Sequence, residues 1–139
     1  SFTSSSNRKT YSNSERCSPF DLKCNKNLRL FNHFLGSVHP AIAGHFVCDF
    51  VLQTDRMAVE KVKGMDETLD WRWWLTAHSA THGLAVSLLT GIPLLGLAEW
   101  IFHALIDWLK SRLMFSLLLD QTLHVCCKLV WVTAFTLLR

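Results

Sequence analysis

The chain has little charge, and its cysteines form no recognisable framework. Charged residues make up 18% of its 139 residues, below the roughly 25% of an average soluble domain, whereas 50% are hydrophobic. The five cysteines include no CxxC pair and are odd in number, which argues against a zinc knuckle or a disulfide scaffold, so we expect free thiols. Basic residues are few and scattered outside the first thirty positions, which disfavours nucleic-acid binding. This composition favours lipid over water as the surroundings.

Residues 1–29 lack an aliphatic run. They are rich in Ser, Asn and Lys and cannot bury enough apolar surface to fold alone, so we expect a disordered polar leader. A secretory signal needs an apolar core of about seven residues, and none occurs before Leu28. Because the chain begins with Ser1, we expect this leader to be processed, truncated or recombinant.

Four apolar segments follow, each long enough or nearly so for the about 20 residues of a membrane-spanning helix. The sequence therefore predicts an all-α fold: a polytopic membrane bundle of about four transmembrane helices over residues 30–139. A soluble helical bundle is the alternative, but the segments offer little polar face for water. The segments cover residues 30–52, 73–92, 94–109 and 113–138.

Prolines, glycines and tryptophans mark the ends of these segments. Pro40 lies inside the first, so a helix either begins near Ala41 or runs through the proline with a kink. Gly91 and Pro93 predict a sharp turn between the second and third segments. The one long polar loop, residues 54–72, meets the second segment at three tryptophans, as interfacial aromatic residues do.

Each apolar segment carries ionisable residues four positions apart, which places both on one face of a helix. Measured from the loops at 1.5 Å per residue, all four pairs fall in one layer, about 5–16 Å deep. An isolated charge there costs about 3 kcal/mol, so these residues are expected to face inward and find partners. The pairs are His45 with Asp49, His78 with His82, His103 with Asp107, and Asp120 with His124, and Glu99 lies one turn before His103.

A divalent metal ion would explain the four pairs together, because imidazole and carboxylate suit zinc, manganese or iron. One hypothesis is a metal-dependent hydrolase acting on a lipid-linked or envelope substrate, with the eight paired residues as ligands and their hydrogen-bond partners. Glu99 would then be the catalytic general base that activates water. Two non-enzymatic alternatives stay open: a helical scaffold held together by polar pairs, and a proton or ion conductor.

Four stretches carry a resemblance to a known family: GHFVCDFVLQTDRMAVEK, LTAHSATHG, EWIFHALIDWLKSR and DQTLHVCCKLVW, in that order. Over about residues 35–131 the chain resembles the bacterial and phage membrane-protein family known as domain of unknown function 3307. The resemblance implies a multi-pass protein of the bacterial inner (cytoplasmic) membrane, with the lipid bilayer as its partner and no established activity. It places the family's motif on His45, Asp49, Gln53, His78, His82, His103, Asp107, Asp120, Gln121 and His124.

Overall fold

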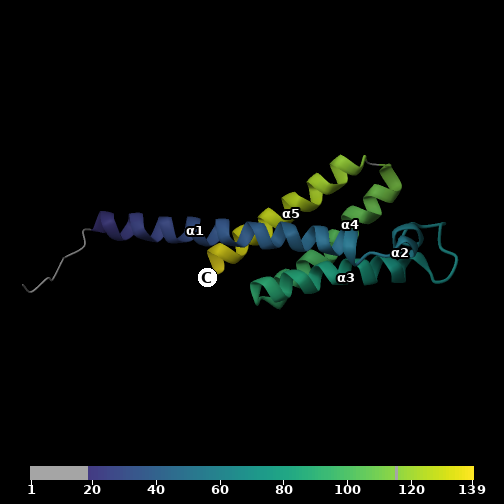
Figure 1. The fold of residues 1–139 in the computed structure, drawn as a ribbon, viewed down its shortest axis with the longest axis horizontal. Coiled ribbons are helices and arrows are strands. Elements are labelled where there is room, and N and C mark those ends of the chain that lie inside the picture. The colour runs from purple at the N-terminus through teal and green to yellow at the C-terminus, as the bar shows by residue number, and fades with distance from the viewer. Residues whose placement is uncertain (1–18, 115) are drawn as a thin grey trace, which may run out of the picture.

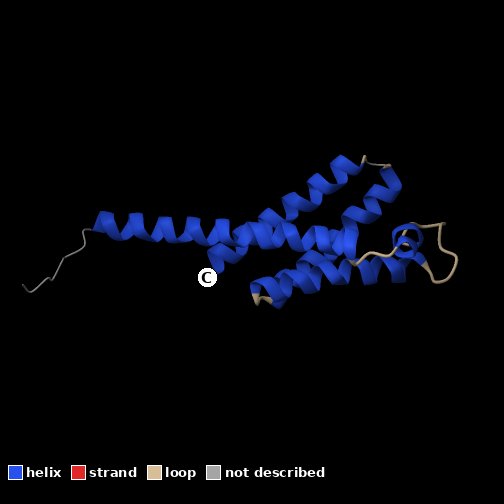
Figure 2. Ribbon diagram, in the orientation of Figure 1, coloured by secondary structure: helices blue, strands red, loops and turns tan. Residues whose placement is uncertain are grey.

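Every regular element in the described part of the chain is helical, which confirms the all-α fold class (Figure 2). The computed structural model describes residues 19–114 and 116–139. Four long helices correspond to the four apolar segments, and two short elements lie between the first and the second. In chain order the elements are α1 (Pro19–Phe46), the π-helical turn η1 (Val47–Val51), α2 (Asp55–Glu60), α3 (Trp71–Thr90), α4 (Pro93–Leu113) and α5 (Leu117–Leu138).

α1 begins at Pro19, not near residue 30, and continues through Pro40 to Phe46. Proline suits the first turn of a helix, because the N–H that it lacks would have no partner there. Of the two alternatives for Pro40, the structure has the continuous helix. Residues 1–18 lie outside the described residues, so the disorder expected for them stays a prediction.

The polar loop contains a short helix that the sequence analysis did not predict. The Thr54 hydroxyl caps α2 by accepting a hydrogen bond from Met57 N at 3.2 Å. Threonine followed by Asp55 is a helix-start signal, but α2 is too short to show a hydrophobic period. α2 packs against the start of α3 at one end of the molecule (Figure 1).

α3 and α4 form a tight antiparallel hairpin. Gly91 ends α3 in the left-handed conformation, with φ at 69°, and Pro93 begins α4, which confirms the predicted turn. A Cβ on Gly96 would lie 2.4 Å from the Gly83 carbonyl oxygen, and one on Gly83 would lie 2.7 Å from the Gly96 carbonyl oxygen. The two backbones can approach this closely only because both positions are glycine, as is common between membrane helices.

Gly96→Ala is expected to push α4 away from α3 and to destabilise the bundle by about 2 kcal/mol, because a backbone carbonyl cannot turn aside as a side-chain tip can. The measurement is the midpoint of unfolding when the micelle-bound protein is titrated with SDS. Gly36→Ala is the matched control, since a Cβ there meets nothing within 4 Å. Equal midpoints for Gly96→Ala and the wild type would show that this close approach does not stabilise the hairpin.

The four long helices enclose one interior. α1 packs against α5 and more lightly against α3, while α4 contacts both α3 and α5 (Figure 1). The Ser116 hydroxyl caps α5 by accepting a hydrogen bond from Leu119 N at 3.3 Å. At one end of this interior an apolar cluster closes the bundle, formed by Val86, Leu95 and Phe135 with Ile92, Trp131 and Ala134 packed against it.

Most other buried side chains are polar or charged, and large apolar side chains are exposed on the outside. Five histidines and Glu99 are 1% exposed, and Lys128 is 2% exposed. On the outer faces Leu88 of α3 is 76% exposed, and Leu94 of α4 is 71% exposed. This distribution is the reverse of that in a water-soluble domain, where charged residues are rarely buried.

Two stretches are long and apolar enough to cross a membrane: Asn25–Val51 and Leu117–Leu138. The prediction of about four transmembrane helices is not supported by this criterion. α4 is interrupted by charged residues, among them Glu99, Asp107 and Lys110, and the tryptophans and histidines of α3 lower its hydropathy. By length and composition, the described helices therefore give two candidate spans, which suggests a membrane protein.

Candidate metal centre

The four predicted pairs meet at one level inside the bundle, each delivered by a different part of it: α1 with η1, α3, α4 and α5. The predicted cluster of histidine and aspartate is therefore present. All of its members are buried except Asp49, which is partly buried. The histidine–aspartate cluster consists of His45, Asp49, His78, His82, His103, Asp107, Asp120 and His124.

Asp49 reaches the middle of the cluster from a turn that departs from α-helical geometry. η1 is π-helical, with a backbone hydrogen bond of 3.0 Å that spans five residues, and such turns are frequent at functional sites. Oδ1 of Asp49 lies 3.3 Å from His78 Nε2 and 3.1 Å from His82 Nε2, both on α3. His103 Nε2 of α4 is 4.0 Å from the same oxygen. One carboxylate oxygen therefore faces three ring nitrogens.

These four atoms outline a metal site. His78 Nε2 and His103 Nε2 are 3.2 Å apart, close to the about 3.3 Å between ligand atoms in a tetrahedral zinc site. The ring centroid of His78 lies 4.9 Å from that of His82 and 5.1 Å from that of His103, near the about 5 Å expected for two imidazoles on one ion. The geometry therefore allows Asp49, His78, His82 and His103 to hold one ion.

His82 is the histidine of the cluster that has both ring nitrogens outside hydrogen-bond geometry. Neither of its ring nitrogens has a hydrogen-bond partner within the described residues, although Asp49 Oδ1 is only 3.1 Å from Nε2. A buried polar group left without a partner costs about 1–3 kcal/mol. A cation accepting the Nε2 lone pair would remove that cost for one of the two nitrogens.

Three imidazoles stack against one another, and an ion would open the stack. The ring centroids of His82 and His103 are 3.6 Å apart, and those of His103 and His124 are 4.0 Å apart. Two imidazoles on one ion need about 5 Å between centroids. Binding through both His82 and His103 therefore requires these two rings to separate by more than about 1 Å.

The second oxygen of Asp49 is held from α1 and α5. Gln121 Nε2 donates a hydrogen bond to Asp49 Oδ2 at 2.8 Å. His45 Nε2 lies 3.2 Å from Gln121 Oε1 and 3.5 Å from Asp49 Oδ2. Hydrogen bonds of this kind orient carboxylates that bind metals. His45 is therefore placed to act through Asp49, outside the four-atom set.

Both oxygens of Glu99 are engaged. Oε1 lies 3.2 Å from His103 Nδ1 and accepts a hydrogen bond from Lys128 Nζ, and Oε2 accepts one from Trp131 Nε1 at 2.6 Å. A proton on Nδ1 of His103, donated to Glu99, leaves Nε2 with its lone pair directed at the cluster. A carboxylate behind a histidine in this way is typical of metal sites.

Sequence reasoning missed Lys128, although a signal for it was present. Lys128 follows His124 at the same spacing of four residues at which His124 follows Asp120. All three therefore lie on one face of α5, and all three are buried. A lysine continuing this polar face inside an apolar segment points to an acidic partner in the interior, which the structure identifies as Glu99.

Asp107 enters the cluster from α4 and belongs to a second group that could hold an ion, with His103 and His124. Its Oδ1 lies 3.3 Å from His124 Nε2, and its Oδ2 accepts a hydrogen bond from Lys61 Nζ at 2.7 Å. The two groups share His103, whose Nε2 can bind only one ion. Because Lys61 already neutralises Asp107, the group around Asp49 is the stronger metal site.

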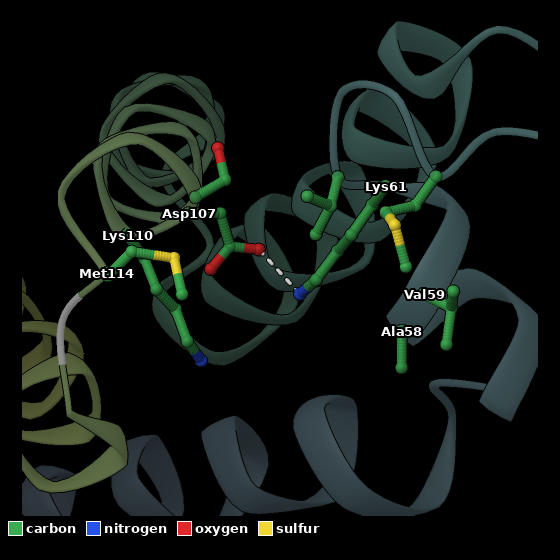
Figure 3. A pocket seen from close by; sticks show the side chains of 9 residues that line it. Ala58, Val59, Lys61, Asp107, Lys110 and Met114 are labelled. Carbon is green, nitrogen blue, oxygen red and sulfur yellow. Dashed lines mark hydrogen bonds and ion pairs between the residues drawn. The ribbon is translucent and has the colours of Figure 1, made fainter.

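Two adjoining cavities reach the cluster from the side of α2. The polar cavity, of about 340 Å³, is lined by Asp49, Asp107 and Asp120. Lys61 and Lys110 line this cavity and also the second, largely apolar one of about 520 Å³. Figure 3 shows Lys61 extending to Asp107 across the apolar cavity. Lys110 Nζ donates to Asp120 Oδ2 at 2.6 Å, so both lysines pair with aspartates of the cluster.

Glu60 fixes the loop that carries Lys61. Its Oε2 accepts hydrogen bonds from Thr68 Oγ1 at 2.6 Å, from Thr68 N at 3.0 Å and from Trp74 Nε1 at 3.0 Å, which ties α2 to α3. The hydrogen bond from the Thr68 hydroxyl is the main cause that lowers the pKa of Glu60, to about 2, although burial of the carboxylate opposes the shift. The loop is thereby held with Lys61 over the cluster.

Glu60→Gln is expected to lower the thermal midpoint near pH 7 and to have no effect near pH 2. Because folding lowers the pKa of Glu60 from 4.5 to about 2, the carboxylate stabilises the fold above about pH 4.5 and ceases to do so as the pH falls to about 2. The measurement is the difference in midpoint between variant and wild type across this range. Glu67→Gln, an exposed position in the same loop, is the control; a difference that stays constant with pH would contradict the assignment.

Fold and site together define an all-helical protein whose bundle encloses a histidine–aspartate cluster with the outline of a metal site. Residues 39–139 match the family described as protein of unknown function, DUF3307, and the chain belongs to this family. The match spans all eight cluster residues and confirms the family that the sequence resembles. No curated protein and no solved structure matches the chain.

Proposed function

We propose that the chain is a membrane protein with a divalent metal centre held by Asp49, His78, His82 and His103. The observation that carries this proposal is the convergence of three Nε2 atoms on one oxygen of Asp49, at distances of 3.1–4.0 Å. Three imidazoles with one carboxylate suit zinc, manganese or iron. The other residues expected as ligands from the sequence lie around these four, either as hydrogen-bond partners or as members of the second possible ion-binding group. They are His45, Asp107, Asp120 and His124.

The balance of charge supports a bound cation. Four carboxylates and three ammonium groups lie in or beside the cluster, which leaves one surplus negative charge when the histidines are neutral. An uncompensated charge in a bundle interior is strongly destabilising. A divalent ion offsets this surplus and gives the Nε2 of His82 a partner. The groups counted are Asp49, Glu99, Asp107, Asp120, Lys61, Lys110 and Lys128.

We propose that the chain lies in the bacterial inner (cytoplasmic) membrane and crosses it several times. An apolar exterior over a charged interior supports a bilayer as the surroundings of all four long helices, including α3 and α4 with their exposed leucines. Helices that bury their charged groups against one another need no more than an apolar outer face to lie in lipid. We propose a bacterial or phage origin because the sequence resembles a family of bacterial and phage membrane proteins.

The activity proposed for this centre is metal-dependent hydrolysis of a lipid-linked or envelope substrate. A divalent ion would supply a Lewis acid and, with water as a further ligand beside the four protein atoms, would activate that water near neutral pH. We assign the general base to Asp107, because it lines both cavities and its Oδ2 lies 3.5 Å from His78 Nε2. Glu99, the base expected from the sequence, lines neither cavity and contacts Nδ1 of His103, so we assign it as a positioning residue for His103.

A proton or ion conductor fits this architecture less well. A conductor needs polar groups along the whole path through the bundle. Beyond Glu99, on the side away from α2, the interior is closed by the apolar cluster of Val86, Leu95 and Phe135. The polar cavity lies on the opposite side of the histidines, at Lys61. A site open to one side serves a substrate that enters and leaves by the same route.

Hydrolysis by the zinc-loaded protein in maltoside micelles tests the activity. The substrates are a phosphoester, a carboxyl ester and an anilide, each with a chromogenic leaving group. Asp107→Asn is expected to lower the rate about 10²–10⁴-fold while bound zinc changes little. His39→Ala, an exposed histidine outside the cluster, is the control. If Asp107→Asn hydrolyses the substrates at the wild-type rate, Asp107 is not the general base. If the wild type hydrolyses none of them faster than the His78→Ala/His82→Ala variant does, the proposal that the protein is a hydrolase is wrong.

A further inference from the structure

The two cavities beside the cluster differ in chemistry and share a wall. The polar one contains carboxylates of the histidine–aspartate cluster, and both fall in the usual size range of ligand sites. Lys61, Asp107 and Lys110 line both, so one molecule can occupy the two cavities at once. The apolar cavity is completed by Ala58, Val59, Val62, Met65, Ser111 and Met114.

The charges around the polar cavity balance once the cluster holds a divalent ion. Asp55 lines this cavity together with Asp49, Asp107 and Asp120, so its carboxylates exceed Lys61 and Lys110 by two negative charges, which the ion offsets. Lys61 and Lys110 are the two cations that border open space, with side chains 14% and 36% exposed. Lysine binds phosphate as a point charge, and the resulting hydrogen bonds are about twice as strong as neutral ones.

We propose that the substrate is an amphiphile with a phosphate head group and a hydrocarbon chain, a proposal that rests on the metal centre described above. The phosphate lies in the polar cavity between Lys61 and Lys110, beside the metal ligands. The chain lies in the apolar cavity against Val59, Val62 and Met114. The juxtaposition of a cationic wall, a metal site and an apolar hollow carries this assignment.

Hydrolysis of such a phosphomonoester balances with water alone. The oxygen of water bonds to phosphorus, and the bond between phosphorus and the alcohol oxygen breaks. Asp107 takes one proton from the water and passes it to the departing alcohol oxygen. The products are inorganic phosphate and a neutral long-chain alcohol, and the alcohol has no charge to hold it at the lysines.

Isothermal titration of zinc-loaded Asp107→Asn protein in maltoside micelles tests the substrate class without turnover of the probe, and the variants below all carry this substitution as well. The probes are decyl phosphate, decanol and inorganic phosphate, with protein-free micelles as the blank. Because head and chain both contribute, decyl phosphate is expected to bind at least about 10-fold more tightly than either other probe. Lys61→Met and Lys110→Met are each expected to weaken its binding about 10-fold. Val62→Trp, which fills the apolar cavity, should weaken the binding of decyl phosphate but not that of inorganic phosphate. Leu88→Trp, on the outer face of α3, should change the binding of neither probe.

Zinc content, measured in the same samples, separates this inference from the metal centre on which it rests. Equal binding of decyl phosphate and decanol by zinc-containing protein would overturn the substrate class and leave the metal centre intact. Tight binding that neither lysine variant weakens, with circular dichroism showing folded helices, would overturn it as well. If the protein contains no zinc, the proposed metal centre is wrong. If that zinc-free protein still prefers decyl phosphate to decanol, and loses the preference in the lysine variants, the phosphate site is still supported.

Discussion

Protein that carries His78→Ala and His82→Ala is expected to lose its metal ion. The wild type, purified in detergent, should hold close to one zinc, manganese or iron per chain, and the double variant less than about a tenth of that. Loss of an outer hydrogen-bond partner alone weakens metal binding about 10–100-fold, and two ligands contribute more. Elemental analysis gives the metal content, and circular dichroism shows whether both proteins remain helical.

His39→Ala is the matched control for this experiment. His39 lies on α1 but is exposed and outside the histidine–aspartate cluster, so its removal should leave the metal content unchanged. Equal metal content in the wild type and the double variant would place the ion elsewhere. If the wild type is helical but contains no metal, the proposed metal centre is wrong, and the protein is a membrane bundle with a polar interior.

Lys128→Met is expected to destabilise the bundle by about 3–5 kcal/mol. The substitution leaves Glu99 without the ammonium group that neutralises it, and a buried charge that loses its partner is strongly destabilising. Methionine keeps most of the volume of the lysine side chain, so little of the effect arises from a cavity. The measurement is the midpoint of unfolding in SDS, converted to free energy with the slope of the wild type.

A double variant separates charge from packing at this position. Glu99→Gln/Lys128→Met removes both charges, and replacing both partners of a buried ion pair is often nearly neutral, so its stability should lie within about 1 kcal/mol of the wild type. Arg72→Met, at an exposed ion pair with Asp70, is expected to cost less than about 1 kcal/mol. Lys128→Met with the stability of the wild type would show that Glu99 is not held as a charged group by Lys128.

The histidine–aspartate cluster was predictable because helical spacing is local information. Residues four apart share a helix face whatever surrounds the helix, and the cost of burying charge then requires the faces to meet. His78 with His82, and His103 with Asp107, show this directly. The turn at Gly91 and Pro93 was predictable for the same reason, since glycine readily adopts the left-handed conformation and proline fixes its own φ.

Other parts of the site depend on contacts between elements, which spacing does not contain. The π-helical turn that brings Asp49 to the ring nitrogens has no signal in the residue pattern of η1. Lys61 belongs to a polar loop, and its place over the cluster depends on its ion pair with Asp107 and on the hydrogen bonds that Glu60 accepts from Thr68 and Trp74. The engagement of Glu99 by Lys128 likewise depends on how α4 packs against α5.

The number of candidate spans differed from the prediction because the polar groups that form the site also lower the hydropathy of the helices that carry them. In α4, Glu99 and Asp107 face the interior, whereas Leu94 and Ile101 on the outer face are exposed. Hydropathy averages over all faces of a helix, whereas a bilayer contacts only the outer one.

X-ray absorption at the zinc edge of the zinc-loaded protein tests the metal centre most directly. The structure predicts nitrogen and oxygen ligands at about 2.0–2.1 Å, with the outer scattering of imidazole rings. No sulfur ligand is expected at about 2.3 Å, although the buried Cys48 directly precedes Asp49. A spectrum with a sulfur shell, or without imidazole scattering, would contradict a centre built from Asp49, His78, His82 and His103.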